Sequence, residues 1–124
     1  MATAQNGEEK IEVVLDIFSG RPNPTWQLSE NQVDELKRKL GTFPPADRKA
    51  PPGLGYRGVR VVNVGNIANI PDRIMAYDGV LGITEKGTTK YYEDSNKIEE
   101  WLLDRAREQG YGEVIERFRQ YSRK

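Results

Sequence analysis

The chain has 124 residues, a length that suits one domain with one hydrophobic core. Hydrophobic residues make up 36% and charged residues 31%, a balance that argues against disordered and membrane-protein classes. The 19 basic residues equal the 19 acidic ones, so the net charge provides no general attraction to nucleic acids or anionic lipids. Cysteine and histidine are absent, which excludes disulfides, thiolate nucleophiles, imidazole bases and zinc sites built on these residues.

The N-terminal residues carry no recognisable targeting signal. Residues 1–9 are polar and lack the apolar segment of a secretory signal. No apolar stretch approaches the roughly 20 residues that a membrane helix needs. We therefore expect a cytoplasmic protein without a membrane partner, with a disordered N-terminus at residues 1–9 and a single domain at residues 10–124.

The first predicted element is a strand over residues 11–18, where polarity alternates with a period of two. One face of this strand is entirely apolar. The other face is half apolar and consists of Glu12, Val14, Asp16 and Phe18. A half-apolar second face is typical of a central strand. The strand ends at Ser19–Pro24, because two prolines fix two φ angles and bias the residues before them toward extended conformations.

The spacing of apolar residues predicts a helix over residues 29–40. Ser29 is a favoured N-cap, and Gln32 three residues later completes a capping box. Gly41 is the expected C-terminal stop. Two i,i+4 ion pairs are expected on the exposed side, Asp34–Arg38 and Glu35–Lys39.

Residues 42–58 form a predicted loop with four prolines and three glycines. Connections of this length are uncommon in compact domains and are often functional or mobile. We expect this segment to act as a lid beside a binding site.

Four further strands are predicted over residues 59–64, 73–77, 80–84 and 88–92. Asp78-Gly79 and Lys86-Gly87 are hairpin-type dipeptides, although Asp78-Gly79 could instead be a bulge inside one longer strand. Asn63, Asn66 and Asn69 recur at every third residue. On a 3₁₀-helix, which has three residues per turn, this period would align the three amides along one edge. Asparagine also has a high turn propensity, which favours turns at these positions.

The C-terminal region has a helical pattern. One apolar stripe includes Ile98, Trp101, Leu102 and Ala106, and a second follows Gly110–Gly112. The predicted order, a strand and a helix followed by further strands and then two helices, indicates an α+β fold. We expect a small, mostly antiparallel sheet of about four or five strands, with a helix from the N-terminal half and two C-terminal helices packed on a face.

The run Ser19–Trp26 is the main candidate for a binding site. Arg21 offers a guanidinium fork and Asn23 an amide, which together can hold a carboxylate or phosphate. Trp26 and Tyr56 could cover an apolar or sugar surface. We therefore predict a small binding protein for an anionic or polar small molecule or peptide, without a cofactor. The alternative is that the prolines only turn the chain, with Trp26 in the core and Arg21 in solvent.

A second hypothesis is a cofactor-free acid–base enzyme, such as an isomerase, cyclase or hydrolase. Asp16 lies between apolar neighbours on its strand face and is a candidate general acid or base. Asp78 is a further candidate base, and Tyr77 a candidate proton donor. Asp16 could instead form an ion pair with a basic residue on the neighbouring strand, such as Arg60.

A third hypothesis is an interaction module, in which the outer face of strand 11–18 or a hairpin edge pairs with a partner or forms a homodimer. Nucleic acid is not an expected partner. Residues 36–60 contain seven basic residues and one acidic residue, but they match no recognised nucleic-acid motif. No metal site is expected, because the acidic residues of 93–104 lack the ligand spacing of a calcium loop.

Overall fold

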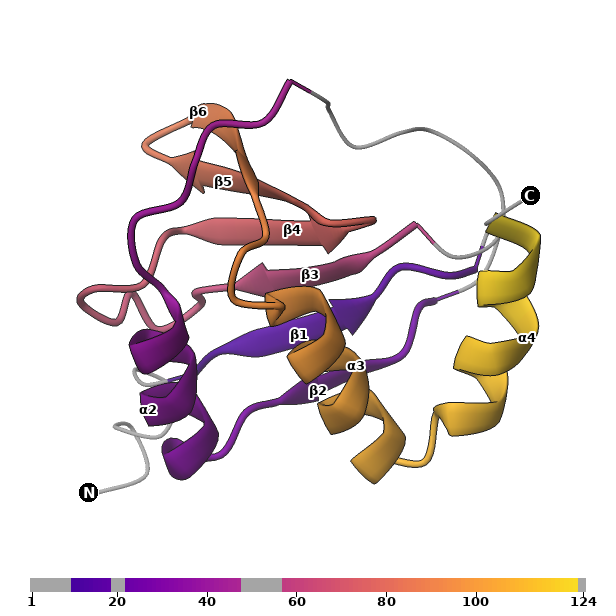
Figure 1. Ribbon diagram of the computed structural model, residues 1–124. Coiled ribbons are helices and arrows are strands. Elements are labelled where there is room, and N and C mark those ends of the chain that lie inside the picture. Colours follow the sequence, from indigo (N-terminus) through magenta and orange to yellow (C-terminus); the bar gives the residue numbers. More distant parts are fainter. Residues whose placement is uncertain (1–9, 19–21, 48–56, 123–124) are drawn as a thin grey trace, which may run out of the picture.

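The computed structural model describes residues 10–18, 22–47 and 57–122, which form one antiparallel sheet and three helices (Figure 1). The strands are β1 (Glu12–Leu15), β2 (Thr25–Gln27), β3 (Val59–Val62), β4 (Arg73–Tyr77), β5 (Val80–Glu85) and β6 (Thr88–Glu93). The helices are α2 (Glu30–Lys39), α3 (Ile98–Glu108) and α4 (Gly112–Ser122). The expectations for residues 1–9 and for the middle of the 42–58 loop lie outside the described residues.

The sheet has the order β2-β1-β3-β4-β5-β6, and all neighbouring strands are antiparallel. The predicted α+β class and the central position of β1 are confirmed. The sheet has six strands where four or five were expected, because Thr25–Gln27 pair with β1 as β2. Three residues that follow a proline loop are too few to display a period, so only the pairing identifies this strand.

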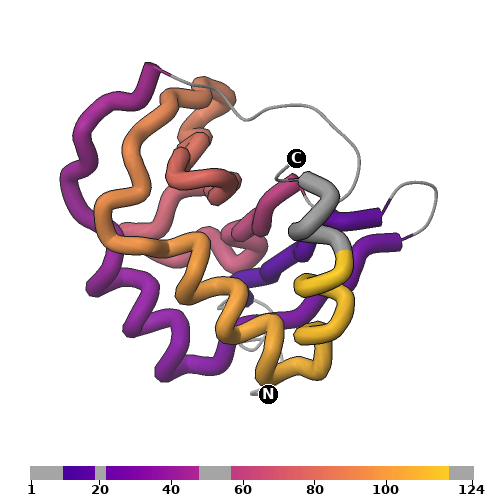
Figure 2. Tube along the Cα trace, turned by 45° about the vertical axis from the view of Figure 1, so that its right-hand side comes forward, coloured from indigo at the N-terminus to yellow at the C-terminus, as the bar shows by residue number. Residues whose placement is uncertain are grey.

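The hydrophobic core lies between the sheet and the helices, which cover one face of it (Figures 1 and 2). The sheet contributes alternate residues at paired positions, including Val13, Val61 and Ile74. The helices contribute the fully buried Leu36, Leu102 and Ile115. Burying each such side chain stabilises the fold by about 1.5–3 kcal/mol. Within the described ranges, no helix is long and apolar enough to cross a membrane.

Two tight hairpins join the last three strands. Asp78 (φ 51°) and Gly79 (φ 82°) connect β4 to β5, and Lys86 (φ 51°) and Gly87 (φ 83°) connect β5 to β6. A type I′ turn requires positive φ at both central residues, and its twist matches that of the strands. The hairpin prediction is confirmed at both sites, and the bulge alternative at Asp78-Gly79 is wrong.

Helix α2 begins with the predicted capping box. Ser29 Oγ accepts from the backbone N–H of Gln32 at 3.2 Å, and Gln32 Oε1 accepts from the backbone N–H of Ser29 at 3.0 Å. The two predicted ion pairs of this helix are wrong, since neither forms in the described part of the chain. Glu35 instead lies 3.9 Å from Arg105 of α3, because packing of α3 beside α2 brings a guanidinium from outside the helix.

The first part of the predicted 42–58 loop runs along the edge of β6. Pro45 forms a bridge with Tyr92, with hydrogen bonds from Ala46 N to Tyr91 O (3.0 Å) and from Glu93 N to Pro44 O (2.8 Å). A segment with two prolines lacks the N–H groups that would let another strand pair outside it, so it covers this edge of the sheet. Residues 44–46 therefore have a structural role that the loop prediction did not include.

The repeated asparagines are turn residues, as the turn interpretation predicted. Asn66 (φ 55°) and Asn69 (φ 69°) adopt the left-handed conformation. Asn63 brackets the turn: its Nδ2 donates to the carbonyls of Ile67 (2.9 Å) and Ile70 (3.0 Å), and its Oδ1 accepts from Ile67 N (2.8 Å). No 3₁₀-helix forms over residues 63–69.

Candidate functional site

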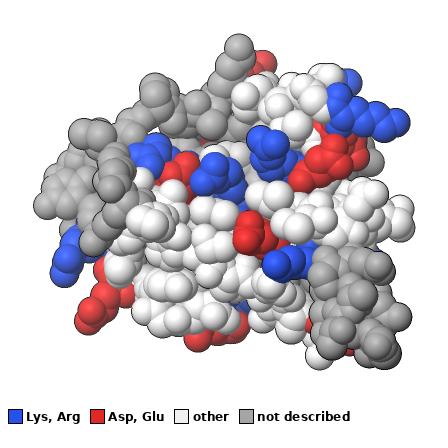
Figure 3. All heavy atoms as spheres, turned by 180° about the vertical axis from the view of Figure 1, so that it is seen from behind, with Lys and Arg blue, Asp and Glu red and all other residues white. Residues whose placement is uncertain are grey.

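The face of the sheet opposite the helices is the open face, and Figure 3 views it from behind the molecule. The strand register aligns one row across it, here called the central row: Thr25, Val14, Arg60, Met75, Gly82 and Tyr91. Figure 3 shows acidic and basic side chains lying close together across the middle of the face, with uncharged surface around them. This face carries Asp16 and adjoins the Ser19–Trp26 run through Thr25.

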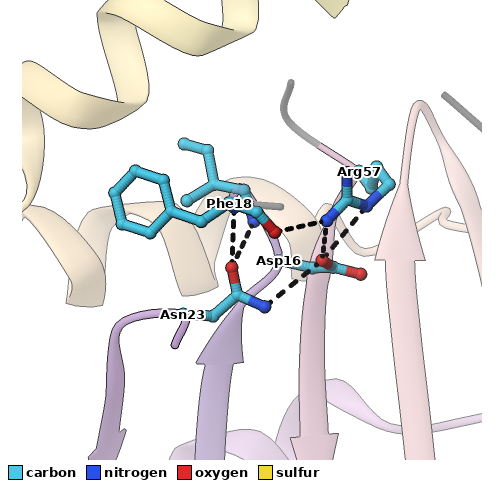
Figure 4. Close-up of polar contacts among 5 residues, drawn as sticks. Asp16, Phe18, Asn23 and Arg57 are labelled. Atoms are coloured by element: carbon cyan, nitrogen blue, oxygen red, sulfur yellow. Dashed lines mark hydrogen bonds and ion pairs between the residues drawn. The ribbon is translucent and has the colours of Figure 1, made fainter. Parts of the chain in front are cut away.

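Asp16, the residue after β1, forms an ion pair with Arg57 (Figure 4). Asp16 Oδ1 accepts hydrogen bonds from Arg57 Nη2 at 2.8 Å and from Arg57 Nε at 3.2 Å. The two side chains are 15% and 22% exposed, respectively. Asp16 was expected to pair with a basic residue, but the suggestion of Arg60 is wrong. The register places Arg60 opposite Val14, whereas Arg57 N donates to the Asp16 carbonyl at 2.8 Å.

Asn23 holds the proline loop against the end of β1. Its Oδ1 accepts from the backbone N–H groups of Ile17 (3.0 Å) and Phe18 (2.7 Å), and its Nδ2 lies 3.4 Å from Asp16 Oδ1. Arg57 Nη2 also donates to the Phe18 carbonyl at 2.8 Å. The amide of Asn23 therefore serves the backbone of its own loop, and its contact with a ligand stays a prediction.

The candidate acid–base residues occupy different surroundings. Asp16 Oδ1 already accepts three hydrogen bonds, so that oxygen offers no free position for a substrate proton. Asp78 is an exposed residue in the hairpin turn between β4 and β5. Tyr77 is half-buried and stands beside Gly58, which binds Asp16 through its carbonyl. The enzyme hypothesis stays untested.

Arg60 is a cation in the middle of the open face. Its Nε is buried and has no hydrogen-bond partner, and its guanidinium forms no ion pair with any described residue. Its neighbours in the central row, Val14 and Met75, are apolar and half-buried. Because a guanidinium stays protonated, a buried N–H without an acceptor costs about 1–3 kcal/mol. Arg60 is thus a charged donor for which the described chain supplies no acceptor.

Three further residues were predicted to contact a ligand: Arg21, Trp26 and Tyr56. Arg21 and Tyr56 lie outside the described residues. Trp26 is 8% exposed and faces the helices, where its ring centroid lies 5.8 Å from that of Tyr111. Trp26 is therefore part of the hydrophobic core, as the alternative interpretation of the proline loop predicted. Trp26 and Arg60 therefore lie on opposite faces of the sheet.

Two cavities lie away from the predicted site. One of about 990 Å³ separates α2 from residues 65–68. The other, of about 490 Å³, lies between residues 40–43 and strands β5 and β6. Neither of these two is lined by a described residue of the Ser19–Trp26 run or by a residue of the central row.

The contribution of Arg57 was missed because 41 residues separate it from Asp16. No local pattern connects two residues at that separation, and Arg57 was assigned to the loop. No protein-family model, curated protein or solved structure matches the chain. Function has to be inferred from the geometry of the chain itself.

Proposed function

We propose that this chain binds an anionic small molecule or a peptide carboxylate on the open face, beside the Ser19–Trp26 loop, and that Arg60 pairs with the anion. The observation that carries this proposal is the guanidinium of Arg60, whose buried Nε has no partner among the described residues. A carboxylate or phosphate can accept hydrogen bonds from the Nη groups of this guanidinium, and it would balance a charge that the described fold leaves without an ion pair.

None of the described carboxylates near Arg60 forms an ion pair with it. Arg57 is already balanced by Asp16 at 2.8 Å, so this pair adds no net charge to the face. Glu12 and Asp16 occupy the diagonal positions across from Arg60, but neither forms an ion pair with it in the described chain. An anion would supply Arg60 with the direct ion pair that the described chain does not form.

The loop contributes through its last exposed residue. In the central row, Thr25 is paired with Val14, and Val14 is paired in turn with Arg60. The hydroxyl of Thr25, Oγ1, donates to the Asn23 carbonyl at 3.1 Å. The Thr25 hydroxyl oxygen can still accept a hydrogen bond from a polar ligand. Asn23 ties the part of the loop next to Thr25 to the end of β1, and a preorganised contact favours affinity.

The proposal can be tested by NMR titration of the ¹⁵N-labelled chain with phosphate, succinate and a short peptide with a free carboxylate. We expect saturable shifts at the Arg60 Nε–H resonance and at the amides of Val14 and Met75. These shifts should vanish in Arg60→Met. They should persist in Arg38→Met, which removes the same charge from an exposed position on α2. Saturable binding that survives Arg60→Met, or none with all three probes, would refute the proposal.

A further inference from the structure

We infer that the ligand of the open face is an aromatic anion, whose charged group pairs with Arg60 and whose planar ring packs on Tyr91. This inference rests on the proposed function and adds the chemical class of the ligand to it. The two contact points lie in the same central row, on strands β3 and β6.

The first observation is the position of the Tyr91 ring. A Cβ atom built on Gly82 would lie 3.1 Å from Tyr91 Cε1 and 3.4 Å from Cδ1, so the ring extends over Gly82 of the neighbouring strand. A larger residue at position 82 would displace the ring from this place. Packing of an aromatic ring over a strand glycine shields the backbone, and it also holds the ring in one orientation. Tyr91 as a whole residue is half-buried.

The second observation is the apolar surface between the two contact points. Met75 and Gly82 occupy the central row between Arg60 and Tyr91, and neither carries a charge. The Met75 sulfur lies 3.2 Å from the position of a Cβ on Gly58, which stands diagonally across from Met75. The thioether therefore lies close to Gly58, the residue before β3.

The separation of these groups defines the size of the ligand. The backbone of Gly82, over which the ring lies, is two strand spacings, or about 10 Å, from the backbone of Arg60. A small anion such as phosphate would use Arg60 alone. A ligand with an aromatic ring on a flexible spacer of this length would contact both groups and bury the apolar surface between them. Ring stacking of this kind raises affinity about 2- to 10-fold.

The test compares three carboxylates that share one head group: hexanoate, 6-cyclohexylhexanoate and 6-phenylhexanoate. Affinity is measured by titration of the Arg60 Nε–H resonance in the wild type and in two variants. Tyr91→Phe keeps the ring, and Tyr91→Leu removes it. We expect 6-phenylhexanoate to bind about 2- to 10-fold more tightly than hexanoate and 6-cyclohexylhexanoate in the wild type and in Tyr91→Phe. In Tyr91→Leu this preference should disappear.

The possible failures are distinguishable. If no carboxylate shifts the Arg60 resonance, the proposed function fails. If all three bind Arg60 with equal affinity, or the phenyl and cyclohexyl compounds bind equally, the proposed function stands and the aromatic class is refuted. Should Tyr91→Leu fail to fold, intermolecular NOEs decide the question in the wild type. Phenyl protons of the ligand must show NOEs to the Tyr91 ring, and NOEs to other residues only would refute the inference.

Discussion

Replacing Gly58 by alanine tests the close approach of strands that positions Arg57 beside Asp16. Gly58 has φ +113°, and its carbonyl accepts from Asp16 N at 2.9 Å. A Cβ added to it would lie 2.6 Å from the Ala76 carbonyl oxygen and 2.9 Å from Tyr77 Cβ. The new methyl group would therefore meet the backbone of β4, which cannot move aside as a flexible side chain would.

Two terms contribute to the expected loss of stability. A left-handed conformation at a residue with a Cβ costs about 1–2 kcal/mol. The 2.6 Å contact is also well below the roughly 3.3 Å at which carbon and oxygen approach each other, and relief of such overpacking costs about 1–3 kcal/mol. We expect Gly58→Ala to lower the free energy of unfolding by about 2–5 kcal/mol, a large part of the usual 5–15 kcal/mol.

Urea denaturation followed by tryptophan fluorescence measures this loss, with Gly87→Ala as the matched control. Gly87 has φ +83°, but a Cβ on it would meet nothing within 4 Å, so this variant reports the backbone term alone. Gly58→Ala should be less stable than Gly87→Ala by about 1–3 kcal/mol. Equal stability of the two variants would refute the close approach of Gly58 to β4.

Asn23→Ala removes the acceptor of two backbone N–H groups and should lower the free energy of unfolding by about 2–4 kcal/mol in urea denaturation. A loss below about 0.5 kcal/mol would contradict the role of Asn23 in holding the loop against β1. Ser29→Ala should cost about 1 kcal/mol through loss of the N-cap, and an unchanged midpoint would contradict this. In Trp101→Phe, Trp26 should emit in the blue and resist acrylamide quenching because it is 8% exposed, whereas a red, readily quenched emission would place its ring in solvent.

Several parts of the fold were predictable because their causes lie within a few residues. The capping box depends on Ser29 and Gln32, three positions apart, and it forms as expected. The hairpins depend on dipeptides that tolerate positive φ, such as Asp78-Gly79. The alternation of residues 11–18 also predicted which side of β1 would be buried. In each case the free energy that selects the conformation comes from local backbone geometry or from the period of the side chains.

The candidate site was predictable only in part. Asp16 was expected to form an ion pair, and it does, but with Arg57 instead of Arg60. Trp26 was expected to be either a ligand contact or a core residue, and it packs in the core. Arg60 was named only as a partner for Asp16, so its isolation on the open face was not anticipated. Strand register decides all three outcomes, and register depends on pairing between distant segments.

The sequence by itself determined the α+β class, the helices and most strands, because periodicity, caps and turn dipeptides act over short distances. Tertiary structure alone decided that Thr25–Gln27 become β2, since these three residues form a strand by pairing with β1. It also decided which cations are neutralised. Arg57 meets Asp16 across 41 residues of sequence, and Arg60 faces outward between apolar neighbours. Such pairings depend on which chain segments the folded sheet brings together.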